Sequence, residues 1–201
     1  MYKITRWPIC RYLLRLLYFN NPEKYAKIIG VKVGKGTKFV RLPKFSSEPW
    51  LISIGENSYI SSDVCFVTHD GGRWVLDNLY PDEKPFYKIG KISIGNNCFI
   101  GMKVMILPNV YVADNCVIGG GSVVTKNIPA GEVWAGVPAR FVCTIEEYKE
   151  RIKKHKLDIN WSAYWSDKEK EIKAHLQSSV FKLSKDLIDS IHEEGIVAYT
   201  S

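Results

Sequence analysis

Aliphatic side chains recur at every sixth position through the middle of the chain. The clearest series is Ile94, Ile100, Ile106, Val112, Ile118 and Val124; the same register appears earlier at Ile54, Ile60 and Phe66, and more faintly at Val33 and Phe39. Four residues after each of the first five members comes a second small or medium side chain: Cys98, Val104, Val110, Cys116 and Ser122. A period of six fits neither the 3.6-residue turn of a helix nor the alternation of a long strand. It predicts a coil of short strands joined by tight turns.

Stacking gives such a coil its core. One side chain of each six-residue unit points inward, and neighbouring coils supply the apolar contacts that a single unit lacks. Each buried Ile or Val then contributes about 1.5–3 kcal/mol. Gly95, Gly101 and Gly119 each follow an aliphatic member directly, and we expect glycine there to allow turn conformations that a Cβ would oppose. The pattern therefore predicts an all-β solenoid over residues 31–143.

The repeat stops after Phe66 and resumes near Ile92. The intervening segment, "VTHDGGRWVLDNLYPDEKPFYKIGK" (67–91), contains glycines and prolines that break regular structure together with several large aromatic side chains. Loops this long inside a compact domain are usually functional or disordered, and the aromatic content argues against disorder. His69, the only histidine of the repeat region, lies at the start. We predict a functional loop insertion over 67–91 with His69 at its root.

The N-terminal segment (1–30) is predicted to be helical. Its apolar stretch "WPICRYLLRLLYF" (7–19) is interrupted by Arg11 and Arg15 and has no small-residue cleavage site after it, so it is a poor secretory signal. It is also too short to span a bilayer. We expect a helix packed on the protein's own body or on a neighbouring subunit. The alternative is peripheral contact with a membrane surface, because the helix is both basic and apolar.

The C-terminal segment (144–201) is predicted to be a helical extension. Thr144 with Glu147, and Ser166 with Glu169, have the spacing of capping boxes. An apolar stripe at helical spacing follows over 180–191 and favours a packing role. The three remaining histidines, at 155, 175 and 192, also lie here. Because none of them is in the coils, the histidine trio of a solenoid zinc enzyme is not indicated, and we predict no metal site.

Composition limits the classes of partner and the cellular compartment that fit this chain. The formal charge of +7 indicates an anionic partner. The basic run at 151–156 has no nucleic-acid-binding module around it, so we expect no nucleic-acid partner. The five cysteines are an odd number with no close pairs, which is typical of neither a disulfide framework nor a zinc knuckle. A reducing cytoplasm fits best.

The later coils resemble a known family. "ISIGNNCFIGMKVMILPNVYVADNCVIGGGSVVTKNIPAGEVWAGVPAR" (92–140) is similar to the closing coils of the hexapeptide-repeat acyltransferases, in the branch that holds galactoside and maltose, xenobiotic, and capsular or O-antigen O-acetyltransferases. The resemblance covers about residues 30–143. It implies a left-handed parallel β-helix, a handedness that the spacing alone does not supply, and a homotrimer with active sites between subunits. "GGGS" departs from the more usual Gly-Ala-Gly-Ser, and "VADN" from Ile-Gly-Asp, without touching the proposed chemistry.

The resemblance implies a catalytic role for His69, which matches the family's catalytic histidine. Acyl transfer to an alcohol needs a base, and a neutral imidazole with a pKa of about 6.5 can take the hydroxyl proton and return it to the departing thiolate. The acid that orients the ring stays open between Asp70, Glu56, Asp63 and an acid of another subunit. We expect Asp70 and Trp74 to contact the acceptor.

The same resemblance implies a site for acetyl-CoA as a co-substrate, with no tightly bound cofactor. By position, Met102 and Gly120 match residues whose main chain meets the thioester end and the pantetheine. Thr125, Lys126 and Arg140 match the nucleotide end. Phe99 stands where a tryptophan is often found and is expected to line the same groove.

Together these features predict a cytoplasmic, trimeric acetyl-CoA-dependent O-acetyltransferase. The expected acceptor is a hydroxyl of a bacterial surface-polysaccharide precursor, and the basic N-terminal helix would suit work at the inner face of the membrane. One alternative is a xenobiotic acetyltransferase that acts on an antibiotic hydroxyl. Another is a non-catalytic solenoid that serves as a scaffold or a sugar-binding protein.

Overall fold

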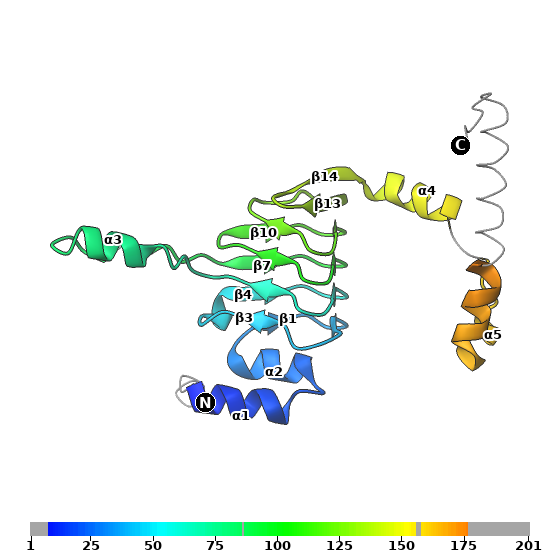
Figure 1. Ribbon diagram of the computed structural model, residues 1–201, viewed down its shortest axis with the longest axis horizontal. Helices are drawn as coiled ribbons and strands as arrows, with labels where there is room; N and C mark the ends of the chain where they lie inside the picture. Colours follow the sequence, from blue (N-terminus) through cyan, green and yellow to red (C-terminus); the bar gives the residue numbers. More distant parts are fainter. Residues whose placement is uncertain (1–7, 86, 156–157, 177–201) are drawn as a thin grey trace, which may run out of the picture. The chain divides into compact units, whose positions relative to one another are not determined.

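The computed structural model describes residues 8–85, 87–155 and 158–176. The chain divides into two compact units, Met1–Glu150 and Arg151–Ser201. The first is a stack of coils with helices at its N-terminal end (Figure 1), and the second is helical where it is described. The predicted boundaries at residues 30 and 143 stay a prediction.

Three parallel sheets, here called A, B and C, form the sides of the stack (Figure 1). Sheet A contains β1 (Lys32–Val33), β4 (Ile52–Ile54), β7 (Ile92–Ile94) and β10 (Val110–Val112). Sheet B contains β2 (Lys38–Phe39), β5 (Tyr59–Ile60), β8 (Phe99–Ile100) and β11 (Val117–Ile118), followed by β13 (Glu132–Gly136) and the antiparallel β14 (Ala139–Thr144). Sheet C contains β3 (Lys44–Phe45), β6 (Cys65–Phe66), β9 (Met105–Ile106) and β12 (Val123–Val124).

The six-residue series forms the core of this stack. Strand pairing places Ile54 beside Ile94, and Ile94 beside Val112, in one column of inward side chains. The other two columns are Ile60, Ile100, Ile118 and Phe66, Ile106, Val124. All of these side chains are buried, as are the second-series residues Cys98, Val104, Val110, Cys116 and Ser122. The predicted solenoid of parallel strands is therefore confirmed.

Glycine follows the inward residue for a different reason from the one predicted. A Cβ on Gly101 would lie 2.6 Å from the backbone nitrogen of Gly120 in the next coil, so glycine is needed for close stacking. The residues with left-handed backbone conformations are others, among them Asn97, Lys103 and Asn109, with φ of 53°, 59° and 63°. The turn-conformation argument for Gly101 was therefore wrong.

Two helices cover the N-terminal end of the stack: α1 (Pro8–Leu17) and α2 (Pro22–Ile29). α2 contacts β1 and β2 and buries Tyr25, Ala26 and Ile29 against the first coil. α1 packs on α2, with Leu14 and Tyr18 partly buried against the core, as the first interpretation of this segment predicted. Within the described residues, no helix combines the length and the apolar character needed to cross a bilayer.

Further elements are the 3-10 turn η2 (Pro49–Leu51) and helices α3 (Arg73–Leu79), α4 (Ile145–His155) and α5 (Trp161–Ser166), and residues 168–176 are also helical. The Thr144–Glu147 capping box is confirmed: each backbone N–H donates to the other residue's side chain, at 2.8 and 3.2 Å. The Ser166–Glu169 box is wrong, because Asp167 accepts from the N–H of Lys170 at 3.1 Å instead. The predicted stripe over 180–191 lies outside the described residues.

Candidate active site

The inserted loop has an ordered root. Backbone hydrogen bonds join its two ends, from the N–H of Gly90 to the carbonyl of Thr68 at 2.8 Å and from the N–H of Asp70 to that of Lys88 at 2.9 Å. Between them, His69 forms an antiparallel bridge with Ile89. Farther out, α3 projects from the stack (Figure 1) and contains no buried residue. The root therefore holds His69 in a fixed backbone frame.

His69 is paired with Glu48 from the preceding coil. The imidazole Nδ1 lies 2.8 Å from Oε2 of Glu48, and the side chains are 41% and 20% exposed. β3 pairs with β6 so that Lys44 lies beside Cys65. Glu48 and His69 each follow those partners by the same number of residues, so strand register places them together at one edge of sheet C.

The charge state of Glu48 fixes the proton on the ring. Partial burial works to raise the pKa of Glu48, but hydrogen bonds from Thr68, His69 and Ser47 outweigh it and hold the pKa below its usual value. The hydroxyl of Thr68, itself buried, donates to Oε2 at 2.7 Å. An ionised carboxylate can only accept, so Nδ1 of His69 carries the hydrogen. In the neutral ring, Nε2 then keeps its lone pair and can act as a base.

The acid that contacts the imidazole is therefore Glu48, and not one of the three acids of this chain that were expected there: Asp70, Glu56 and Asp63. The carboxylate of Asp70 accepts from the N–H of Gly72 at 2.8 Å and lies 3.7 Å from Nζ of Lys88. Glu56 and Asp63 belong to turns at the two other corners of the coil. The missed signal was the separation of 21 residues between Glu48 and His69, which equals the offset between paired strands β3 and β6.

His69 opens into a pocket of about 280 Å³ at the loop root. Its wall includes Asp70, Arg73 and Tyr87. The guanidinium of Arg73 donates to Asp77 at 3.0 Å and lies 4.3 Å from the centroid of the Tyr87 ring. Trp74 is 74% exposed and does not line this pocket. Of the two residues expected to contact the acceptor, only Asp70 is brought to His69.

The residues expected at the thioester end meet at one corner of the stack. Met102 and Gly120 occupy equivalent turns between sheets B and C in adjacent coils. The carbonyl of Met102 accepts from the N–H of Gly121 at 2.7 Å, and a Cβ on Gly120 would lie 3.2 Å from that oxygen. The main chains of the two turns therefore pack closely on each other. The corner is still accessible to solvent, because Met102 and Gly120 are both exposed.

The residues expected at the nucleotide end are more dispersed. Thr125 and Lys126 follow β12 at the edge of sheet C where His69 also lies, and Nζ of Lys126 is 5.1 Å from the ring centroid of Trp134. Arg140 lies on β14 and donates to the carbonyl of Ala139. Phe99 faces outward on sheet B, where it stacks on Tyr59 at 5.8 Å. Sheet C separates the Met102 corner from the His69 edge within one chain.

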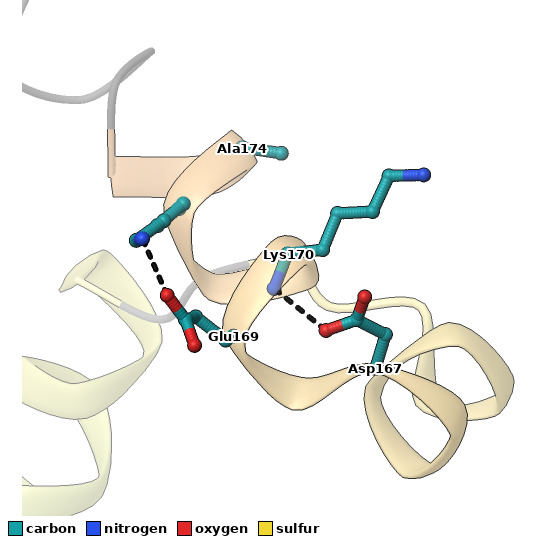
Figure 2. Close-up of a pocket in the computed structure, with 5 residues that line it drawn as sticks. Asp167, Glu169, Lys170 and Ala174 are labelled. Carbon is teal, nitrogen blue, oxygen red and sulfur yellow. Dashed lines mark hydrogen bonds and ion pairs between the residues drawn. The ribbon is translucent and has the colours of Figure 1, made fainter.

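A larger hollow, of about 460 Å³, lies in the second unit and is lined by Asp167, Glu169, Lys170, Lys173 and Ala174. Its charged groups make local helical contacts: Lys173 pairs with Glu169 at 2.5 Å, and Asp167 accepts from the backbone N–H of Lys170, as Figure 2 shows. Its lining contains no histidine or cysteine. Among the residues that the structure describes, no three His, Cys, Asp or Glu side chains are grouped to hold a metal ion.

Comparisons with known proteins agree with this architecture. Residues 91–126 match the family model described as bacterial transferase hexapeptide (six repeats). Protein CapG of Staphylococcus aureus is 41% identical over 141 residues, which cover 69% of this chain and 80% of CapG. The galactoside O-acetyltransferase of Escherichia coli K12 is 54% identical over 142 residues, covering 62% of this chain and 69% of that enzyme.

Among solved structures, the hexapeptide-repeat acetyltransferase of Vibrio cholerae matches with a TM-score of 0.54 and 18% identity, over 71% of this chain and 92% of that one. This likeness concerns the fold. The family model and the CapG alignment concern the sequence: the model matches residues 91–126, which lie in the coils that carry the clearest aliphatic repeat, and the alignment spans four fifths of CapG. The chain therefore belongs to the hexapeptide-repeat family of acyltransferases.

Proposed function

We propose that this acyltransferase moves the acetyl group of acetyl-CoA to a hydroxyl of a sugar, in a precursor of a bacterial surface polysaccharide. The observation that carries the proposal is the His69–Glu48 pair at the wall of a pocket, with Nε2 of the imidazole left to act as a base. The sugar acceptor is supported by the relative named galactoside O-acetyltransferase and by the aromatic loop beside the pocket.

The proposed chemistry is a direct transfer. Nε2 of His69 takes the proton of the acceptor hydroxyl while the oxygen attacks the thioester carbonyl, and a C–O bond forms. Backbone N–H groups stabilise the oxyanion of the tetrahedral intermediate. The C–S bond then breaks, and the imidazolium returns its proton to the departing thiolate. The Glu48 carboxylate stabilises the imidazolium and holds the tautomer that this cycle needs.

We assign the acceptor to the loop-root pocket. Arg73, fixed by Asp77, covers one face of the Tyr87 ring, and the tyrosine is still 67% exposed. A sugar that packs against Tyr87 would bring a hydroxyl toward His69, because both side chains line the same pocket. We therefore assign contact with the acceptor to Arg73 and Tyr87 in place of Trp74, and we keep the expected contact for Asp70.

We assign the donor to a groove between subunits. Met102 and Gly120 lie at one edge of sheet C, whereas His69, Thr125 and Lys126 lie at the other. In a closed trimer, the first edge of one chain can face the second edge of its neighbour, so that both sets would contact one acetyl-CoA. This arrangement, with the left-handed winding that the resemblance implies, forms part of the proposal. So does a cytoplasmic setting, which suits the five free cysteines.

The test measures thiol release from acetyl-CoA across a panel of sugars and antibiotics. With a sugar acceptor, His69→Ala is expected to lower kcat/KM by about 10²- to 10⁴-fold and to lower the melting temperature only slightly, because the ring is partly exposed and Thr68 still donates to Glu48. Turnover of His69→Ala at the wild-type rate would remove His69 from its role. Turnover of antibiotics alone would favour the xenobiotic alternative, and no thiol release with any acceptor would favour a scaffold.

A further inference from the structure

The N-terminal end of the stack carries an apolar surface that acyl transfer does not use. α1 is the outermost layer there, beyond α2 (Figure 1). Leu14 and Tyr18 face the core. Five large apolar side chains of α1 and the turn that follows it are each more than half exposed: Tyr12, Leu13, Leu16, Leu17 and Phe19.

The spacing of these residues gives α1 an outward apolar face. Leu13, Leu16 and Leu17 stand three and four residues apart and so share one side of the helix. Arg15, which is exposed, lies outside that side, about 100° around the helix axis from Leu16. An apolar face combined with exposed basic residues elsewhere on the helix is typical of helices that lie in the membrane interface.

A ring of positive charge surrounds the same end of the stack. The first coil carries an exposed basic residue on each sheet and in each of the two turns between them: Lys32, Lys35, Lys38, Arg41 and Lys44. No Asp or Glu occurs between Glu23 and Glu48. None of these five residues forms an ion pair with another described residue.

The need to shield an end coil from association does not explain why all five of these charges are positive. A terminal coil needs a polar outer surface, which neutral or mixed residues would provide. In the second coil, strand pairing places Ser53 beside Lys32, Tyr59 beside Lys38 and Cys65 beside Lys44. All three partners are uncharged, so the positive charge belongs to the end of the stack and not to the repeat.

We propose that this end of the stack docks on an anionic lipid bilayer, with the outer face of α1 in the interface and the basic ring above the headgroups. A second copy of the chain is a poorer partner, because a symmetric contact through α1 would bring two basic rings together. Nucleic acid would pair with the ring, yet it offers no apolar phase for the leucines. An anionic bilayer offers both.

The test is flotation of the full chain with vesicles of phosphatidylcholine, with or without phosphatidylglycerol, at low and high salt. We expect binding only to the anionic vesicles and weaker binding at high salt. The double variant Leu13→Ser, Leu17→Ser should lower the partition coefficient by about tenfold or more. Replacing Lys32, Lys35 and Lys38 with Gln should lower it by up to roughly fivefold per residue at low salt.

The matched control removes similar groups elsewhere. Val75→Ser with Leu79→Ser on α3, or Lys103→Gln in a later coil, should leave vesicle binding unchanged, since all three residues are exposed away from this end. The proposal is overturned if wild-type protein ignores anionic vesicles, or if binding survives loss of the leucines. It is also overturned if the leucine variants change the sedimentation coefficient and not the partition, which would mark a contact between copies.

Discussion

The later coils (92–124) and the inserted loop (67–91) are neighbours in the chain and are stabilised in opposite ways. In the coils, Ile100 and Ile118 are fully buried, and β7, β8, β9 and β11 each pair with a strand on either side. In the loop, α3 buries nothing, and Trp74 and Leu79 are 74% and 64% exposed. Only the loop root, around His69, shares the order of the stack through its hydrogen bonds.

The coils and the loop are therefore suited to different tasks: the coils to rigid positioning of side chains, and the loop to variation in sequence. A close-packed stack holds its atoms in one arrangement, which suits a base that must meet a hydroxyl within hydrogen-bond distance. The projecting part of the loop makes few internal contacts, so its sequence can change without unfolding the stack. The proposed chemistry lies at the junction, where His69 of the loop contacts Glu48 after the first coil. Changes at the junction should therefore affect rate, and changes in the stack should affect stability.

The largest expected effect is at the junction. Glu48→Gln presents an amide that can donate to Nδ1, which favours the tautomer with the proton on Nε2 and removes the base. We expect kcat to fall by about 10²- to 10⁴-fold, with the KM for acetyl-CoA unchanged, in steady-state thiol-release assays. Asp70→Asn is the matched control and should cause a much smaller loss. Equal losses in the two variants would contradict the assignment of Glu48.

The next effect is on the stack. Ile100→Ala removes a fully buried side chain between two coils and should lower the free energy of unfolding by about 2–5 kcal/mol. Val75→Ala in α3, where the side chain is 57% exposed, should change it by less than about 0.5 kcal/mol. Urea titration of both variants measures the contrast. Similar losses would mean that α3 packs against something in solution.

A gentler comparison uses one substitution in both regions. A Cβ on Gly101 would meet backbone atoms of the next coil at 2.6–2.9 Å, whereas one on Gly71 would meet nothing within 4 Å. Gly101→Ala should therefore cost about 1–3 kcal/mol of stability. Gly71→Ala should be neutral or raise stability by up to about 1 kcal/mol, because it restricts the unfolded chain. Thermal unfolding followed by circular dichroism would show the difference, and a neutral Gly101→Ala would refute the close-stacking argument.

The stack could be predicted from the sequence and the junction only in part. The six-residue period places Ile94, Ile100 and Ile106 inward wherever the coils lie, because burial is set by neighbours at fixed offsets. His69 stands out as the lone histidine of the repeat region. Glu48 does not, because it follows the first coil, where Val33 and Phe39 give only a faint repeat. Its partner became visible once the pairing of β3 with β6 fixed the register.

The smallest expected effect concerns stability at low pH and again sets the junction against the stack. The pKa of Glu48 lies below its reference value of 4.5 in the folded chain, so the ionised carboxylate stabilises the fold above that value. This contribution is lost as the pH falls from about 4.5 through the lowered folded-state pKa. Replacing Glu48 by Gln removes it, so the melting temperature of Glu48→Gln should fall less steeply than that of wild type in this acidic window. Above it the two curves should run parallel. If they stay parallel throughout, the Thr68 and His69 hydrogen bonds do not favour the charged carboxylate, and His69 would need another acid to hold its proton at Nδ1.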